Sequence, residues 1–262
     1  FVKEDKWEDD KSRFTSVTYT IKGKNLTTVS RRDKEVDTVW TIEPLVKSID
    51  DVKLFLELPD EIFEENVDIR HMEEEEKKLN DKGIIMVDTE DPVCAVASMF
   101  KLEDFTLFAL TEKKLCHALL EKHSVYINKR IEKAAKEFPG RLWRIYGPEF
   151  ITEPFLPPAL FEEYVVKYTG PLIQTIKKYG GSVRIHAHGC VRNILDYVVQ
   201  MGADAIDPIE PPPHGDVELK YLREKYGILL VLFGNIEITD IENMPNDIFR
   251  KNVRKSLSEG TA

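Results

Sequence analysis

From residue 83 onward, short apolar segments alternate with longer segments of helical pattern, and this alternation restricts the fold more than any other feature. The apolar segments read GIIMVD, LWRIYG, SVRIHAH, ADAIDP and ILLVLFGN. Segments with a helical pattern lie between and after them, at 91–138 (long enough for at least two helices), 158–179, 190–201, 215–226 and 245–259. Because strands that alternate with helices form βαβ units, the pattern predicts an α/β fold with a parallel sheet.

Polar side chains follow several of these expected strands, in chain order Glu149, His186, His188, Asp207, Glu210, Asn235 and Glu237. A (β/α)8 barrel carries its active site at the carboxyl ends of its strands, and an open doubly wound sheet also binds ligands there. No glycine-rich phosphate loop follows the early strands, which disfavours a dinucleotide site. Before residue 83, the alternation within 1–45 predicts a small antiparallel β-meander, and Ser48 is expected to cap a helix.

Charge and cysteine content exclude several classes of protein. The 262 residues carry a formal net charge of −10, which argues against a nucleic-acid binder because such proteins gather Lys and Arg. No apolar run is long enough to span a membrane, and no secretory signal is visible. The three cysteines are scattered, so no disulfide framework is expected and the cytoplasm is the predicted location.

The segment SVRIHAHGC (182–190) carries the most specific chemistry. Side chains alternate along a strand, so Arg184, His186 and His188 share the side opposite Val183 and Ile185. Two imidazoles two residues apart have Cβ atoms about 6–7 Å apart, near enough to hold one Zn²⁺ ion. The alternative is a pair of histidines that bonds neighbouring side chains or the acid groups of a substrate. Cys190 is either a third ligand or a small buried side chain.

Three proline-stiffened or glycine-containing loops add further candidates. The loop DPIEPPPHGD (207–216) presents Asp207 and Glu210, and Glu210 is a candidate metal ligand, acid/base or loop anchor. Asp216 follows Gly215 and is expected to cap the next helix. The loop YGPEFITEPFLPP (146–158) presents Glu149 as a candidate acid/base. The loop LFGNIEI (232–238) presents Asn235 and Glu237 as candidates for binding a polar substrate. Asn235 is alternatively a turn residue after Gly234.

The segments 146–165 and 185–237 together resemble the uroporphyrinogen decarboxylase superfamily, through YGPEFITEPFLPPALFEEYV and IHAHGCVRNILDYVVQMGADAIDPIEPPPHGDVELKYLREKYGILLVLFGNIE. A weaker resemblance extends from about residue 14. The resemblance implies a TIM (β/α)8-type barrel, here as a single domain over 1–262 whose βα units occupy 83–262. It also implies one of two activities, decarboxylation in porphyrin biosynthesis or zinc-dependent methyl transfer between corrinoid proteins and thiols.

Two departures from the family pattern favour the methyltransferase branch. The decarboxylases carry an RQAGRY-like substrate segment, which has no match here, and they lack a histidine pair at this strand end. The methyltransferases have H-x-C where this chain has H-x-H, so the resemblance maps His186 and His188 onto two zinc-ligand positions. Their further cysteine, on a later strand, has no counterpart. We expect both ends to be trimmed and the barrel to be incomplete.

Three functions follow from these observations. The first is metal-dependent methyl transfer to a thiol or small-molecule acceptor, with Zn²⁺ on His186 and His188 and a corrinoid protein as partner. Here Glu149, Glu210 and Asp207 are the candidate catalytic residues. The second is decarboxylation of uroporphyrinogen or a related acid, with Arg184 and Arg192 binding carboxylates. The third is a non-catalytic remnant or binding protein.

Overall fold

A computed structural model describes residues 2–260, and their contacts form two compact units. The first unit consists of residues 1–65 and 95–126, and the second consists of residues 66–94 and 127–262. The sequence-based expectation of one domain therefore stays a prediction, and each unit is described by itself.

The first unit contains an antiparallel sheet whose strands follow one another in chain order, β1 (Val2–Glu8), β2 (Ser12–Ile21), β3 (Lys24–Asp33) and β4 (Val39–Glu43). The meander expected from the sequence is thus present. Gly23 closes the β2–β3 turn with φ +76°, a left-handed conformation that glycine adopts without strain. The inner end of the sheet is anchored by buried Ile21 and Leu26, while Tyr19 meets Phe55 of α1 (Ile49–Leu56) edge-on, with ring centroids 6.3 Å apart.

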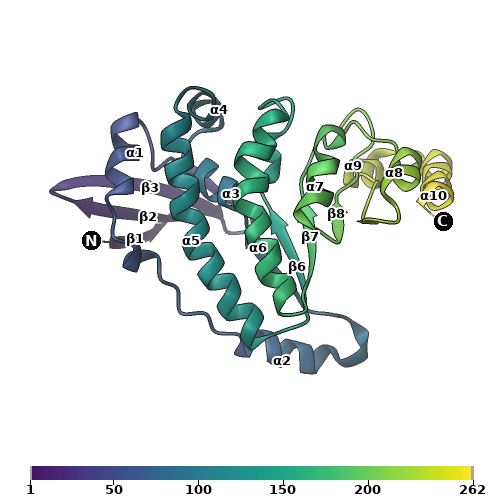
Figure 1. The fold of residues 1–262 in the computed structure, drawn as a ribbon, viewed down its shortest axis with the longest axis horizontal. Coiled ribbons are helices and arrows are strands. Elements are labelled where there is room, and N and C mark those ends of the chain that lie inside the picture. Colours follow the sequence, from purple (N-terminus) through teal and green to yellow (C-terminus); the bar gives the residue numbers. More distant parts are fainter. Residues whose placement is uncertain (1, 261–262) are drawn as a thin grey trace. The chain divides into compact units, whose positions relative to one another are not determined.

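The second unit contains five parallel strands, again in chain order, β5 (Met86–Glu90), β6 (Leu142–Tyr146), β7 (Ser182–His186), β8 (Ala205–Asp207) and β9 (Val231–Leu232). Figure 1 labels β6, β7 and β8. Strands β6 to β9 lie inside apolar segments picked out in the sequence, and β5 begins inside GIIMVD and extends two residues beyond it. Neighbouring strands pair from β5 to β9, and β5 does not pair with β9, so the described residues form an open sheet rather than a closed ring. The expectation of a barrel-type fold with an incomplete ring is confirmed.

The two sides of the parallel sheet differ because side chains alternate along each strand. One side is apolar and packed, with Val87, Trp143, Val183, Ile185 and Ile206 all at most 6% exposed. Helix α6 (Lys167–Lys178) contacts β7, and α7 (Leu195–Met201) packs beside α6 (Figure 1). The other side is polar and carries the candidate site.

The remaining helices follow the predicted segments, with additional short turns. Beyond α1, α6 and α7 they are, in chain order, η1 (Asp60–Phe63), α2 (Arg70–Leu79), η2 (Asn80–Lys82), α3 (Pro92–Ala97), α4 (Leu102–Thr111), α5 (Lys113–Glu137), η3 (Pro148–Ile151), η4 (Phe161–Val166), η5 (Arg192–Ile194), α8 (Leu219–Tyr226), α9 (Ile238–Asn243) and α10 (Asn246–Gly260). The segment 91–138 indeed divides, into α3, α4 and α5. Helix α9 was not predicted, because its six residues are too few for a clear apolar period.

Capping expectations met opposite outcomes at two helices. At α1, the Ser48 hydroxyl accepts a bond from the backbone N–H of Asp51, as predicted. At α8, the cap position is Glu218, so the prediction for Asp216 is wrong. Its carboxylate instead accepts a bond from the backbone N–H of Arg192, 3.1 Å away. A backbone N–H in the preceding βα unit therefore bonds the carboxylate that a helix N-terminus would otherwise use.

Candidate active site

The two histidines lie together at the carboxyl end of β7. His186 is the last strand residue, and His188 lies two residues later, in the connection to η5. Their rings are perpendicular, with centroids 4.8 Å apart. The His188 side chain is 54% exposed and that of His186 is 20% exposed. The pair is therefore accessible from solvent.

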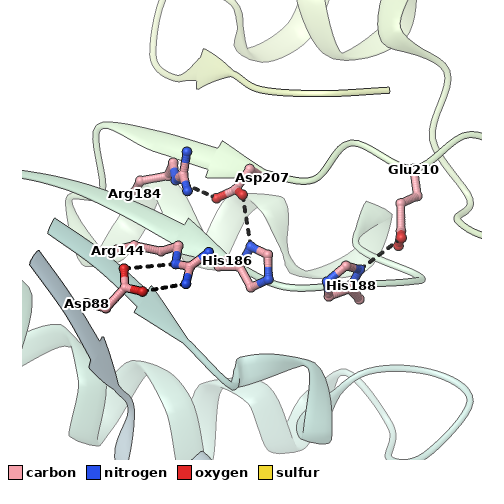
Figure 2. Close-up of polar contacts among 7 residues, drawn as sticks. All are labelled: Asp88, Arg144, Arg184, His186, His188, Asp207 and Glu210. Carbon is pink, nitrogen blue, oxygen red and sulfur yellow. Dashed lines mark hydrogen bonds and ion pairs between the residues drawn. The ribbon is translucent and has the colours of Figure 1, made fainter. Parts of the chain in front are cut away.

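A carboxylate from the next βα unit holds each histidine through Nδ1 (Figure 2). Asp207 Oδ2 lies 2.8 Å from Nδ1 of His186, and Glu210 Oε1 lies 2.9 Å from Nδ1 of His188. Because an ionised carboxylate only accepts hydrogen bonds, both Nδ1 atoms must donate. In a neutral ring with a proton on Nδ1, Nε2 carries the lone pair. Within the described residues, the hydrogen bonds of both rings are made through Nδ1, so the Nε2 lone pairs stay available. This is the arrangement that orients imidazoles as metal ligands.

The two carboxylates are themselves fixed in place. Asp207 Oδ1 lies 2.8 Å from Nε of Arg184, an ion pair whose atoms are not aligned for a hydrogen bond. The Arg184 guanidinium also lies over the Phe233 ring, 5.0 Å from its centroid. Glu210 Oε2 accepts the backbone N–H of Gly189 at 2.5 Å, so this carboxylate spans two consecutive residues of the β7 loop. Asp207 and Glu210 thus lie on the Nδ1 side of the rings.

Glu149 is the third carboxyl group near the histidines. It belongs to η3, directly after β6, and its side-chain Oε2 is buried without a hydrogen-bond partner among the described residues. Burial raises the pKa of Glu149 above its ordinary value, and the neighbouring His186 and His188 act in the opposite direction. A carboxyl group that titrates closer to neutrality is suited to give and take protons.

A tight turn at Gly147 brings η3 against the start of α3. Gly147 has φ +113°, and a Cβ atom there would lie 2.1 Å from Cβ of Cys94. Asp91 caps α3 by accepting the backbone N–H of Cys94 at 2.6 Å, and its other oxygen accepts the Thr169 hydroxyl at 3.2 Å. Complete burial raises the pKa of Asp91 to about 8. Burial also raises the pKa of the Cys94 thiol, which keeps it protonated and unreactive.

The polar side of the sheet also holds residues that the sequence analysis did not select. Asp88, Arg144 and Arg184 share one register row, and Tyr146 shares the next row with His186. Arg144 donates to both oxygens of Asp88, at 3.0 and 2.5 Å (Figure 2). The alternation of side chains used for SVRIHAH applies equally to MVDTE and LWRIY. It would have identified the three residues not selected before, Asp88, Arg144 and Tyr146.

Asn235 and Glu237 lie apart from the contacts of the histidine pair. Both line a cavity between the proline loop after β8 and helices α9 and α10. Asn235 has φ +117° and follows Gly234, also at positive φ, so it is part of a tight turn after β9. Cys190 pairs with Glu153 in an isolated β-bridge, and its thiol is free and half-buried.

The donor set suits a metal ion in part. Two imidazole nitrogens with free lone pairs and a buried, unpartnered carboxylate oxygen match the mixed nitrogen and oxygen ligands of Zn²⁺. In residues 2–260, however, no three His, Cys, Asp or Glu side chains are already gathered as a metal-binding group. The histidine pair is therefore the preformed part of the site, and Glu149, whose carboxyl group interacts electrostatically with both histidines and has a buried, unpartnered oxygen, is the candidate to join it.

Comparison with known proteins identifies the family. Residues 40–262 match the family Uroporphyrinogen decarboxylase (URO-D). The chain belongs to the uroporphyrinogen decarboxylase family. Among solved structures, it is similar to a methyltransferase from Methanosarcina mazei, with a TM-score of 0.59 and 15% sequence identity. The match covers 85% of this chain and 64% of that methyltransferase, and it supports the fold. No curated protein matches the sequence.

The family membership agrees with the expected superfamily and with the α/β fold described above. In the part of the chain that the structure describes, no helix has the length and apolar character needed to cross a bilayer. The histidine pair, its carboxylate partners and Glu149 all lie within the matched residues.

Proposed function

We propose that this family member is a metal-dependent methyltransferase, in which His186 and His188 hold Zn²⁺ and a thiol or other small molecule accepts the methyl group. The observation that carries the proposal is the pair of carboxylate-backed imidazoles. Asp207 and Glu210 fix both rings in the tautomer that offers Nε2 as a ligand. When bound, Zn²⁺ supplies Lewis acidity that favours the deprotonated, nucleophilic form of a thiol.

The remaining roles fall to side chains of this chain. Asp207 orients His186, Glu210 orients His188, and Arg184 holds Asp207 against the sheet. Glu149 either completes the ligand set or takes the proton that the acceptor releases, a role for which its raised pKa is suited. A corrinoid protein in the cytoplasm is the proposed methyl donor, docking at the carboxyl ends of the strands.

The alternative of a decarboxylase needs cationic groups that are free to bind substrate carboxylates. Both arginines considered for this task are already engaged. Arg184 pairs with Asp207, while Arg192 donates from Nε to the backbone oxygen of Asp216 and lies over the Tyr221 ring at 4.5 Å. A polycarboxylate substrate would have to share these guanidinium groups with the contacts that they already make, which supports the methyltransferase proposal over the decarboxylase.

The test combines metal content with methyl transfer. Purified protein dialysed against Zn²⁺ is expected to retain the metal, and His186→Ala is expected to lose it. With methylcobalamin as donor and a small thiol as acceptor, the wild-type protein should demethylate the corrinoid, which its absorbance reports. Zinc binding without transfer would identify a binding protein, and turnover of uroporphyrinogen instead would identify a decarboxylase.

A further inference from the structure

The cavity lined by Asn235 and Glu237 opens at the carboxyl ends of β8 and β9, apart from the histidine pair. Its volume is about 360 Å³, within the range of small-molecule sites. The proline loop after β8 forms one wall, and the turn after β9 with α9 and α10 forms the others. In parallel α/β folds this end of the sheet is where ligands bind.

The cavity shares a loop with the histidine site. Glu210 is bonded to His188, and the next residue, Pro211, lines the cavity together with Pro212 and Pro213. The loop is held at its far end as well, because the backbone N–H groups of His214 and Gly215 both donate to the carbonyl oxygen of Pro211, at 3.1 Å. The two sites therefore lie next to each other along one rigid segment.

The lining combines apolar surface with an excess of carboxylates. Met244, Phe249 and Ile236 supply apolar contact alongside the prolines. Lys255 pairs with Glu218 at 3.3 Å and lies 3.8 Å from Glu259.

The half-buried carboxylates of Glu237 and Asp240 also line the cavity, and neither has a cationic partner among the described residues. Half-buried carboxylates without partners interact with a cation more strongly than fully exposed ones do. The apolar walls add contact for a hydrocarbon group, and the amides of Asn235 and Asn252 offer further hydrogen bonds.

We propose that this cavity binds a small organic ammonium ion, with its charged group between Glu237 and Asp240 and its hydrocarbon part against Met244 and Phe249. A neutral molecule of the same shape would fill the apolar part but leave both carboxylates unpaired. An organic anion would be repelled by them. The ligand site therefore discriminates by charge at a position separate from the metal-binding pair.

The experiment titrates the metal-free protein of residues 1–262 with n-butylammonium, 1-butanol and butyrate as matched probes. Methyl-labelled methionine provides the readout by NMR, because Met244 lines the cavity while Met72, Met86, Met99 and Met201 do not. Met244→Leu assigns the signal. Butylammonium is expected to shift the Met244 resonance saturably and to leave the other four in place, with butanol binding at least about fivefold more weakly.

Variants then assign the charge recognition. Glu237→Gln and Asp240→Asn are each expected to weaken butylammonium binding by about three- to fivefold. Glu242→Gln is the control, because Glu242 is an exposed carboxylate on the same helix as Asp240 and does not line the cavity. Equal affinity for butylammonium and butanol, or unchanged affinity in both variants, would overturn the proposal. No zinc is present, so this outcome is separate from the outcome of the methyl-transfer test.

Discussion

Replacing Gly147 by alanine tests whether the turn after β6 is as tightly packed as the structure shows. Two costs add. The left-handed backbone, at φ +113°, costs an alanine about 1–2 kcal/mol. The new Cβ would lie 2.1 Å from Cβ of Cys94, and relieving such overlap costs roughly 1–3 kcal/mol. We expect Gly147→Ala to lower the free energy of unfolding by about 2–5 kcal/mol.

Gly140→Ala separates the two costs. Gly140 also has positive φ, at +73°, but no atom lies within 4 Å of the position of its Cβ. Gly140→Ala should therefore lower the free energy of unfolding only by the cost of the left-handed backbone, about 1–2 kcal/mol. Urea denaturation followed by circular dichroism measures both variants. Equal losses in the two variants would refute the packing argument. Adding Cys94→Gly to Gly147→Ala should recover part of the loss, as a double-mutant cycle would show.

Three further predictions concern the groups around the histidines. Asp207→Asn should weaken zinc binding by about 10- to 100-fold in a chelator competition assay, because His186 loses the carboxylate that orients it. Glu210→Gln should act similarly through His188, and unchanged affinity in both variants would contradict the assigned orienting roles. The third prediction concerns pH: the pKa of Asp91 is raised from 3.8 to about 8, so the folded state binds more protons than the unfolded state between these values. The free energy of unfolding should therefore fall as pH rises through this window, and Asp91→Asn should make the fall shallower in denaturation experiments at pH 5 to 8; an identical slope would contradict the buried carboxyl.

The sequence predicted the parallel sheet well because its strands are short, apolar and separated by helical patterns. Strands β6 to β9 fall within predicted segments, and β5 overlaps its predicted segment and ends two residues later. Capping was predicted less well. Ser48 met the expectation because its partner, the N–H of Asp51, is local, whereas Asp216 is bonded to Arg192 in the preceding βα unit. Local spacing indicates which N–H groups are within reach, but a competing donor brought close by the fold is not visible in it.

For the candidate site, the sequence identified the histidine pair and all three neighbouring carboxylates, and the structure adds their geometry. Alternation along the strand placed Arg184 and His186 on one side, and that period is a property of the backbone. Which atom of Asp207 or Glu210 meets which ring depends on the parallel register and on the proline loop, and neither is encoded in local spacing. Asp91 and Gly147 were not predicted from the sequence, because their importance arises from close packing between β5, β6 and α3.

A crystal of the protein grown with Zn²⁺ and measured at the zinc absorption edge tests directly whether the two imidazoles at the end of β7 hold a zinc ion. We expect an anomalous difference peak between the rings of His186 and His188, within about 2.0–2.1 Å of both Nε2 atoms. An absence of any peak there, while zinc occupies other positions on the protein, would contradict this expectation.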